Sequence, residues 1–216
     1  MSKTYVPRTP EEMALRVVQD IPDGAYVNLG IGRPMLVSNF LPPDKDIILQ
    51  SENGILGMGA VAVGSDYDPE MVNAGKQSVT LLKGAALFHH GDSFTMIRGG
   101  HIDICILGAF QVSRNGDLAN WRTPDADAIP AVGGAMDLAY GAKQIFIMME
   151  HCTKDGRSKL VEKCNYPLTA EGVVKRIYTD LATLEVVDDN FLVIDRVEGL
   201  SHEQLEHISG LKLEEI

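Results

Sequence analysis

Two long runs of apolar residues constrain the fold more than any other feature of the chain. Residues 102–110 and 145–150 are apolar at almost every position, without the polar–apolar alternation of a half-buried strand. Such runs are typical of strands that are buried on both faces, which occur in sheets covered by helices on both sides. We therefore predict an α/β protein whose sheet is mostly parallel or mixed.

Helix signals alternate with strand signals along the rest of the chain. Thr9 and Glu12 form a capping box, and Ser201 with Gln204 opens a last helix that Gly210 closes. The alternation predicts a three-layer α/β fold, and because no linker or repeat is visible, we expect residues 1–216 to form one domain. Further strands are expected at residues 25–29, 47–50, 78–82, 184–187 and 191–194, and further helices at 34–40, 135–144 and 171–177, the last of which could run into a strand.

The chain of 216 residues is acidic, with 19 lysines and arginines against 30 aspartates and glutamates and a formal charge of −11. This balance argues against binding to nucleic acid or to an anionic membrane surface, since both need clustered positive charge. No apolar stretch is long enough to span a bilayer and no secretory leader is visible, so we expect a cytoplasmic protein. The three cysteines lack the spacing of a zinc site, and Cys105 is predicted to be a small core residue.

The most specific local pattern is Gln50-Ser51-Glu52-Asn53-Gly54, in which a carboxylate follows an apolar strand and precedes Asn-Gly. Asn-Gly permits the positive φ of a sharp turn. Such a turn would hold Glu52 at the carboxyl end of the strand, where ligands bind in open α/β sheets. A carboxylate in a water-poor cleft can act as a base or as a covalent nucleophile. The same pattern also fits a glutamate that only caps a turn.

Three glycine-rich segments are predicted to form tight turns: Gly30-Ile31-Gly32, Gly57-Met58-Gly59 and Gly133-Gly134. Each could present backbone N–H groups to an oxyanion or a phosphate, or serve only as a turn. None completes the glycine pattern of dinucleotide-binding proteins, and residues 73–77 lack the features of a P-loop.

Two further groups of polar residues have a structural interpretation that we favour over a functional one. His89, His90 and His101 are poorly spaced to share a metal ion, so hydrogen-bonded structural roles are expected and no metal site is predicted. Glu150 ends a buried strand and is a second candidate carboxylate, for which an ion pair or turn at the strand end is the favoured interpretation.

Six segments occur together in an order that resembles one known family. They are residues 27–32 (VNLGIG), 50–54 (QSENG), 73–76 (NAGK), 96–101 (MIRGGH), 116–121 (GDLANW) and 133–138 (GGAMDL). Together they resemble the B-type (β) subunit of the family I 3-oxoacid CoA-transferases, over nearly the whole chain. Within that family, residues 88–94 and 107–112 are most similar to the 3-oxoadipate CoA-transferases.

The resemblance implies the fold shared by ribose-5-phosphate isomerases and CoA-transferases. It also implies ping-pong transfer of CoA from succinyl-CoA to a 3-oxoacid, with 3-oxoadipate favoured over acetoacetate and the breakdown of aromatic compounds as the setting. Glu52 matches the catalytic glutamate that carries CoA as a thioester, so CoA is a substrate and no metal, flavin or nicotinamide is implied. The expected partner is the A-type subunit of the same enzyme, in a heterodimer or a dimer of heterodimers. The positions that would bind substrate or an oxyanion are Asn28, Gly30, Gly32, Asn53, Gly133, Gly134 and Ala135.

Two segments depart from the family pattern, at Arg33 and at residues 59–62. Arg33 stands where many relatives carry an apolar residue, so it is a candidate for pairing with the far carboxylate of a dicarboxylic acyl group, or else a solvated arginine. Both departures leave the acyl specificity open. The alternatives are a related transferase of acetate or another short acyl group, a CoA-thioester hydrolase, and a noncatalytic binding subunit on the same fold, against which the intact setting of Glu52 argues.

Overall fold

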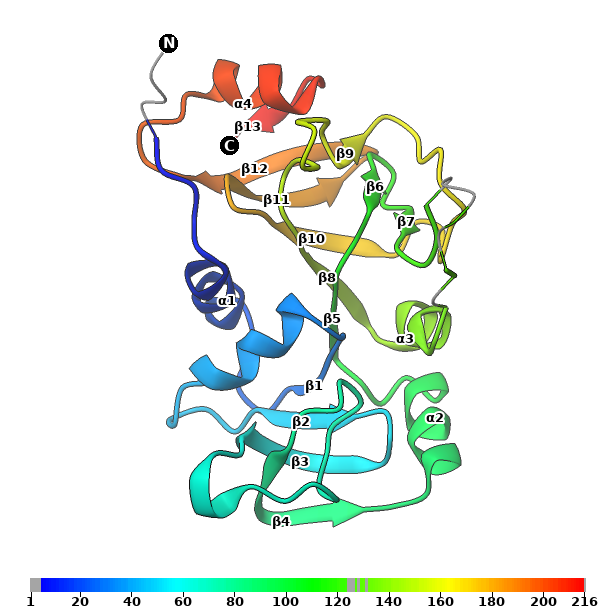
Figure 1. Ribbon diagram of the computed structural model, residues 1–216. Coiled ribbons are helices and arrows are strands. Elements are labelled where there is room, and N and C mark those ends of the chain that lie inside the picture. The colour runs from blue at the N-terminus through cyan, green and yellow to red at the C-terminus, as the bar shows by residue number, and fades with distance from the viewer. Residues whose placement is uncertain (1–4, 124–126, 128, 131, 216) are drawn as a thin grey trace.

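A ten-stranded sheet runs through the centre of the protein in the computed structural model, which describes residues 5–123, 127, 129–130 and 132–215. The strands are β1 (Tyr26–Leu29), β2 (Ile48–Ser51), β3 (Ile55–Val61), β4 (Val79–Leu87), β5 (Ile104–Leu107), β8 (Gln144–Met148), β10 (Val174–Tyr178), β11 (Ala182–Val187), β12 (Asn190–Arg196) and β13 (Glu214–Glu215). They lie in the order β13-β12-β11-β10-β8-β5-β1-β2-β3-β4, and the sheet twists from β4 at one end of the molecule to β13 at the other (Figure 1).

The strands at the centre of this sheet are parallel: β2, β1, β5, β8 and β10. On one side β3 and β4 continue the sheet in antiparallel pairing, with the short 3₁₀ helix η2 (Gly64–Asp66) in the segment that joins them. On the other side β11 and β12 are antiparallel too. The prediction of a mostly parallel or mixed sheet is confirmed, and the parallel strands all end along one edge of it.

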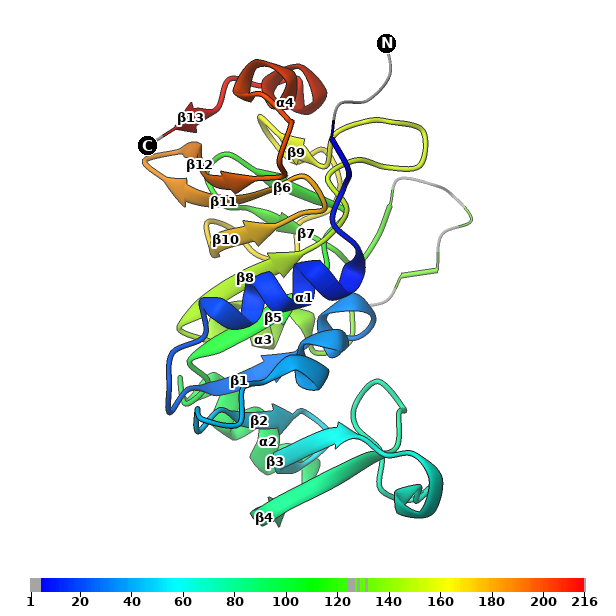
Figure 2. The ribbon, with the colours of Figure 1, turned by 90° about the vertical axis from the view of Figure 1, so that its left-hand side faces the viewer.

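Helices cover both faces of the sheet. The helix α1 (Pro10–Gln19) and the 3₁₀ helix η1 (Arg33–Phe40) lie on the face turned to the viewer in Figure 2, and α2 (His90–Arg98) and α3 (Ala135–Gly141) lie behind it. The last helix, α4 (His202–Ser209), packs near β12 and β13. The predicted three-layer architecture is confirmed.

The strand β5 shows how the sheet separates two cores. Ile104 and Ile106 belong to the core that α1 covers, whereas Cys105 and Leu107 belong to the core that α2 and α3 cover. All four residues are buried, which confirms the prediction of a strand without a solvent-exposed face and of a core position for Cys105. The regular part of this strand is shorter than the apolar run of residues 102–110 that predicted it.

A second, smaller sheet packs on the core that α2 and α3 cover. Its strands are β6 (Gln111–Ser113), β7 (Leu118–Ala119) and β9 (Leu160–Val161), in the order β7-β6-β9. Val112, Leu118 and Leu160 bury their side chains in that core. The sequence pattern gave no sign of this sheet, because strands of two or three residues are too short to show a period.

The capping predictions for the first and last helices are confirmed. Thr9 and Glu12 form the capping box of α1, and Ser201 and Gln204 form that of α4. Gly210 ends α4 in the left-handed conformation, with a φ of +66°. Among the described residues, no helix combines the length and the apolar character that a membrane crossing requires.

The pairing of β3 with β4 differs from the prediction. Gly57-Met58-Gly59, expected as a tight turn, lies inside β3, and β4 runs to Leu87 instead of ending at residue 82. Gly57 has a φ of +80°, and a Cβ atom on Gly59 would collide with Thr80 of the facing strand. The pairing also shifts register on either side of Met58. These glycines permit the irregular pairing of β3 with β4. In the sequence, the same glycine pattern is typical of a tight turn.

The prediction of a helix over residues 171–177 is wrong. Gly172 has a φ of +62°, which a right-handed helix excludes, and the chain then enters β10 between β8 and β11. Val174, Ile177 and Tyr178 are buried because β10 lies inside the sheet. Their spacing fits a helix or a strand, and the backbone hydrogen bonds to two neighbouring strands decide for the strand.

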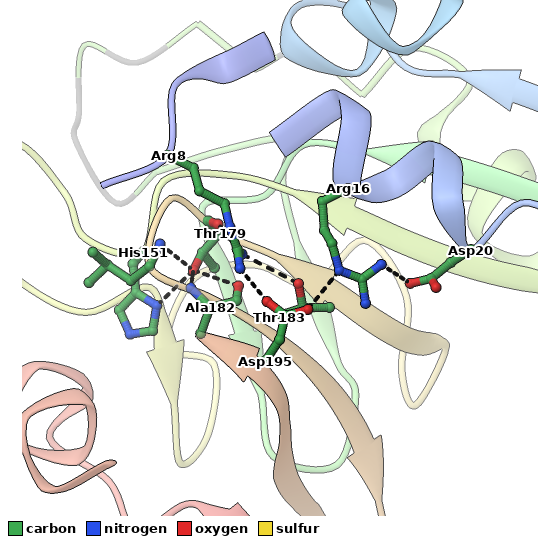
Figure 3. A network of polar contacts seen from close by, with 9 residues as sticks. Arg8, Arg16, Asp20, His151, Thr179, Ala182, Thr183 and Asp195 are labelled. Atoms are coloured by element: carbon green, nitrogen blue, oxygen red, sulfur yellow. Dashed lines mark hydrogen bonds and ion pairs between the residues drawn. The ribbon is translucent and has the colours of Figure 1, made fainter. Parts of the chain in front are cut away.

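Charged side chains connect the N-terminal segment to β12 (Figure 3). Arg8 and Arg16 both form ion pairs with Asp195, and Arg16 also pairs with Asp20 at 2.8 Å. The Arg8 amide donates a hydrogen bond to the Asp180 carbonyl at 2.7 Å. These partly buried contacts hold α1 and the segment before it against the sheet, where β10, β11 and β12 lie side by side.

His151 lies close to this network and is fully buried. Its Nδ1 lies 3.1 Å from Thr179 Oγ1, and its Nε2 lies 2.9 Å from Ser209 Oγ, so one side chain joins the end of β10 to α4. Burial lowers the pKa of His151 to about 4. The folded protein therefore keeps this imidazole neutral at pH values where the unfolded chain would protonate it.

We expect His151 alone to lower the free energy of unfolding by about 2 kcal/mol between pH 7 and pH 5. The unfolded histidine takes up a proton below a pKa of 6.5, whereas the folded one does so only near pH 4, so stability is lost as the pH falls through this window. Urea unfolding at both pH values should show a correspondingly smaller pH dependence for His151→Gln. His101→Gln, which changes an exposed histidine, should keep the wild-type dependence. An unchanged dependence in His151→Gln would contradict this account.

Candidate active site

A cavity of about 420 Å³ opens at the carboxyl ends of the central parallel strands. Its wall is formed by the segments after β1, β2, β5 and β8, by the start of α3 and by the residue before β9. This is where open α/β sheets bind ligands. The structure brings together six of the predicted site residues in the cavity wall: Gly30, Arg33, Glu52, Gly133, Gly134 and Ala135.

Glu52 is placed by a turn between β2 and β3 that only glycine permits. Gly54 has a φ of +114°, and a Cβ atom there would collide with the Phe88 carbonyl oxygen. The Phe88 amide donates a hydrogen bond to the Gly54 carbonyl at 3.0 Å, so the turn packs against the segment before α2. The sharp turn expected from Asn-Gly is present, and Glu52 follows β2 into the cavity wall.

A chain of buried polar side chains supports the end of β2. Asn28 Nδ2 donates to Gln50 Oε1 at 2.6 Å, and Gln50 Nε2 donates to Ser93 Oγ at 2.5 Å. Ser93 Oγ donates at 3.4 Å to the carbonyl of Ser51, the residue before Glu52. A buried network in which the polar groups have hydrogen-bond partners holds its side chains in one arrangement. Sequence reasoning overlooked this role of Gln50 and Ser93, although a glutamine inside an apolar strand was a visible signal.

The Glu52 carboxylate itself has neither a hydrogen bond nor an ion pair within the described part of the chain. Burial raises the pKa of Glu52 above its ordinary value; the nearby His90 acts against this rise and Asp137 adds to it. Because its charge is poorly solvated and unpaired, this carboxylate is available to react with an electrophile in the cavity.

Glycine at position 134 leaves the space that the Glu52 carboxylate occupies. A Cβ atom on Gly134 would lie 2.9 Å from Glu52 Oε2 and 2.9 Å from Phe94 Cζ. Both distances are too short for van der Waals contact. The backbone at the start of α3 therefore lies too close to the carboxylate for a side chain to fit between them without a shift.

The backbone N–H groups around the cavity differ in whether they donate a hydrogen bond to a described residue. The Gly30 amide donates to a β5 carbonyl at 2.8 Å, and the Ala135 amide donates to the carbonyl three residues earlier at 3.2 Å. These two amides are already used. For Gly133 and Gly134, no described residue accepts a hydrogen bond from the amide. Among the predicted oxyanion donors that line the cavity, these two amides are the ones without an acceptor in the described part of the chain.

Three predicted site residues do not line the cavity: Asn28, Gly32 and Asn53. Asn28 is buried in β1 beside Gln50 of the neighbouring strand β2. Gly32, with a φ of +91°, precedes η1 and permits the bend there. Asn53 Nδ2 donates to a backbone carbonyl 19 residues later at 2.7 Å. These residues shape the site from outside its wall.

Arg33 and Glu150 both line the cavity and form an ion pair in which Arg33 donates to Glu150 Oε1 at 2.5 Å. This hydrogen bond lowers the pKa of Glu150. The ion pair favoured for Glu150 on sequence grounds is therefore present, and its partner is the arginine that departs from the family pattern. Arg33 is 38% exposed, so a ligand in the cavity could reach it.

The histidines near the site have structural contacts. The Gly91 amide donates to His89 Nδ1 at 3.0 Å, so His89 caps α2, and the His90 ring packs against Phe94. Within the ranges that the structure describes, no three His, Cys, Asp or Glu side chains are grouped to hold a metal ion.

Comparison with known proteins settles the family of the chain. The family model for coenzyme A transferase matches residues 11–204. The chain belongs to the coenzyme A transferase family. Among the transferases most similar to it is the B-type subunit of 3-oxoadipate CoA-transferase from Pseudomonas putida, which is 58% identical over 202 residues that cover 94% of each chain. The protein of the same name from Acinetobacter baylyi is 54% identical over 210 residues that cover 97% of each chain.

A solved transferase structure has the same fold. An acyl-CoA transferase from Escherichia coli O157:H7 matches with a TM-score of 0.76 at 18% sequence identity. The match covers 97% of this chain and 42% of the other, so this transferase chain spans less than half the length of that one. The expectation of a CoA-transferase-like fold is confirmed.

We expect Glu52→Gln to stabilise this transferase at neutral pH, because the substitution removes a charge that burial disfavours. A carboxyl group whose pKa rises on folding destabilises the fold once it ionises, so the gain should be present at pH 7 and vanish as the pH falls below about 4.5. Urea unfolding at both pH values measures it. Glu150→Gln is the opposite control, since it removes a carboxylate stabilised by Arg33 and should cost at most about 1 kcal/mol at pH 7. Destabilisation by both variants at pH 7 would contradict the assignment for Glu52.

Proposed function

We propose that this chain is the B-type subunit of a CoA-transferase that moves coenzyme A from succinyl-CoA to a 3-oxoacid, with 3-oxoadipate as the preferred acceptor. The observation that carries the proposal is the Glu52 carboxylate in the wall of the cavity, which has no hydrogen-bond or ion-pair partner among the described residues. The amides of Gly133 and Gly134, which donate to no described residue, line the same cavity. The two relatives named as the B-type component of 3-oxoadipate CoA-transferase support the choice of acceptor. Their name also supports an A-type chain of the same enzyme as the partner.

Glu52 supplies the nucleophile for the first half of the reaction. Its carboxylate attacks the acyl carbonyl of succinyl-CoA, the carbon–sulfur bond breaks, and CoA leaves as a thiolate from a mixed anhydride. The thiolate then attacks the glutamyl carbonyl of the anhydride and expels succinate. CoA is now bound to Glu52 as a thioester.

The second half repeats these steps with the acceptor. The acceptor carboxylate attacks the glutamyl thioester and releases the CoA thiolate, which then attacks the acceptor carbonyl of the new anhydride. Glu52 returns as a carboxylate, and the acceptor leaves as its CoA thioester. No water is consumed, so the free energy of the thioester bond is carried from donor to product.

Each attack on a carbonyl produces an oxyanion that needs hydrogen-bond donors. The amides of Gly133 and Gly134 are candidates, because they are free among the described residues and Gly134 lies against the Glu52 carboxylate. Loss of one such donor typically costs about 3–4 kcal/mol of transition-state stabilisation. Backbone donors are suited to this role because they are fixed before the reaction begins.

We expect the chain to form a covalent adduct when it is co-expressed with its A-type partner and treated with succinyl-CoA without acceptor. Its mass should rise by that of CoA minus water, and Glu52→Gln should show no rise, because an amide cannot form the anhydride. Intact mass spectrometry measures both. Glu203→Gln, which changes an exposed glutamate on α4, should form the adduct as the wild type does. Turnover without an adduct, or normal turnover by Glu52→Gln, would overturn the proposal, and steady release of free CoA without acceptor would favour a hydrolase.

We expect Gly134→Ala to lower kcat by about 10- to 100-fold, since an added methyl group forces the Glu52 carboxylate out of place. Steady-state kinetics with the A-type partner present measures the effect. Gly108→Ala is the matched variant: Gly108 also lines the cavity, but its Cβ would meet nothing within 4 Å. Its loss of kcat should be much smaller. Equal losses would show that any methyl group in this cavity is harmful and that the contact with Glu52 is not the cause.

A further inference from the structure

One charged side chain in the cavity wall has no part in the chemistry proposed for Glu52. Lys159 precedes β9 and lines the cavity together with Arg33 and Glu150. Its backbone is fixed on both sides, because its amide donates to the His151 carbonyl and its own carbonyl accepts from the Val112 amide, both at 2.9 Å. The side chain therefore extends from a rigid part of the small sheet.

The Lys159 ammonium group has no hydrogen bond and no ion pair with any residue that the structure describes. The side chain is half-buried, and burial lowers the pKa of Lys159 while Glu150 acts against this shift. Holding a cation in such a place without an anion costs free energy, which an anionic ligand would recover. Arg33, the other cation in the wall, differs from it, since Glu150 already pairs with Arg33.

The charges of the cavity wall fit a ligand with one extra negative charge. The wall contains two cations, Arg33 and Lys159, and two carboxylates, Glu52 and Glu150. When Glu52 carries CoA as a thioester, its charge is lost, and the wall then holds two cations and one carboxylate, Glu150, while Asp180 acts on Lys159 from outside the wall. The wall of the loaded cavity is then one positive charge in excess, which one ligand carboxylate would balance.

We propose that Lys159, together with Arg33, binds the distal carboxylate of dicarboxylic acyl substrates. The inference rests on the proposed function, since it assigns part of the same site. A succinyl group and 3-oxoadipate each carry a second carboxylate at the end away from the reacting carboxyl. Glu150 is the internal counter-ion that keeps Arg33 in the wall, and Lys159 is the cation left for the ligand.

The location of Lys159 distinguishes this role from binding of the CoA phosphates. Lys159 and Glu52 line one cavity of about 420 Å³, so they enclose the acyl group that reacts at Glu52. Phosphate binding at Lys159 would affect every acyl-CoA alike. Carboxylate binding affects only acids that carry a second carboxylate, and this difference is measurable.

The test compares two acceptors of equal length on the preloaded enzyme. The complex with the A-type partner is first loaded with excess succinyl-CoA, and the thioester is verified by mass. The decay of the thioester is then followed by rapid quench after addition of 3-oxoadipate or of 3-oxohexanoate. The second acid has a methyl group in place of the distal carboxylate. For Lys159→Met, the rate constant with 3-oxoadipate should fall by about 10- to 100-fold, the usual range for a lost hydrogen bond to a charged group. The rate constant with 3-oxohexanoate should not fall.

Three controls make the outcome decisive. Cleavage of the thioester by hydroxylamine should be the same in the wild type and in Lys159→Met, because this small neutral nucleophile needs no carboxylate subsite. Lys159→Arg should recover most of the rate with 3-oxoadipate, and Lys154→Met, which changes an exposed lysine before β9, should match the wild type. An unchanged rate with 3-oxoadipate, or an equal fall for all three nucleophiles, overturns the assignment of Lys159. Failure of the wild-type complex to form a thioester overturns the proposed function instead.

Discussion

The close approach of Gly54 to the Phe88 carbonyl is the contact on which the geometry of the site depends. It joins the turn after β2 to the segment that leads into α2. Glu52 lies on one side of this contact, and Ser93 and Phe94 of α2 lie on the other. A side chain at position 54 would separate the two segments, and the carboxylate would lose its position against the backbone of Gly134. The proposed nucleophile is therefore positioned to a large extent by main-chain packing.

This reliance on backbone also explains how an acidic chain can serve a polyanionic substrate. A formal charge of −11 would repel CoA if the whole CoA molecule bound to this chain. The groups that this chain offers at Glu52 are uncharged amides, and its two cavity cations face the acyl end of the substrate in the proposed function. In the proposed assembly, the cations for the CoA phosphates come from the A-type partner or from the interface with it.

Sequence reasoning predicted the features that depend on local pattern. The capped helices, the strand buried on both faces and the turn after Glu52 follow from residues next to each other in the chain, and the structure contains all of them. Contacts between distant segments were harder to predict. The chain forms a strand at Val174–Tyr178 because β8 and β11 pair with it. The helix α2 is capped by His89, an uncommon capping residue that the local sequence does not predict.

The same division applies to the site. Ordered motifs found Glu52, the cavity glycines and Arg33, because each stands in a short recognisable segment. Lys159 and the support that Asn28, Gln50 and Ser93 give to β2 were not found, since they act through partners between 22 and 43 residues away or through a cavity that only the fold creates. Polar residues inside buried strands, such as Asn28 and Gln50, are thus a better guide to such roles than spacing alone.

Cys105 has a consequence for a site that handles thioesters. Its thiol is fully buried in β5, 3.7 Å from the Asn28 side-chain oxygen, and burial together with the charge of Glu52 raises its pKa far above the ordinary value. Only a thiolate attacks a thioester at a useful rate, and a thiol held in this way does not ionise at neutral pH. In the proposed mechanism, the Cys105 thiol, which also lies outside the cavity wall, therefore does not compete with Glu52 for the acyl group. The chain can keep this sulfur in its core without forming a dead-end protein thioester.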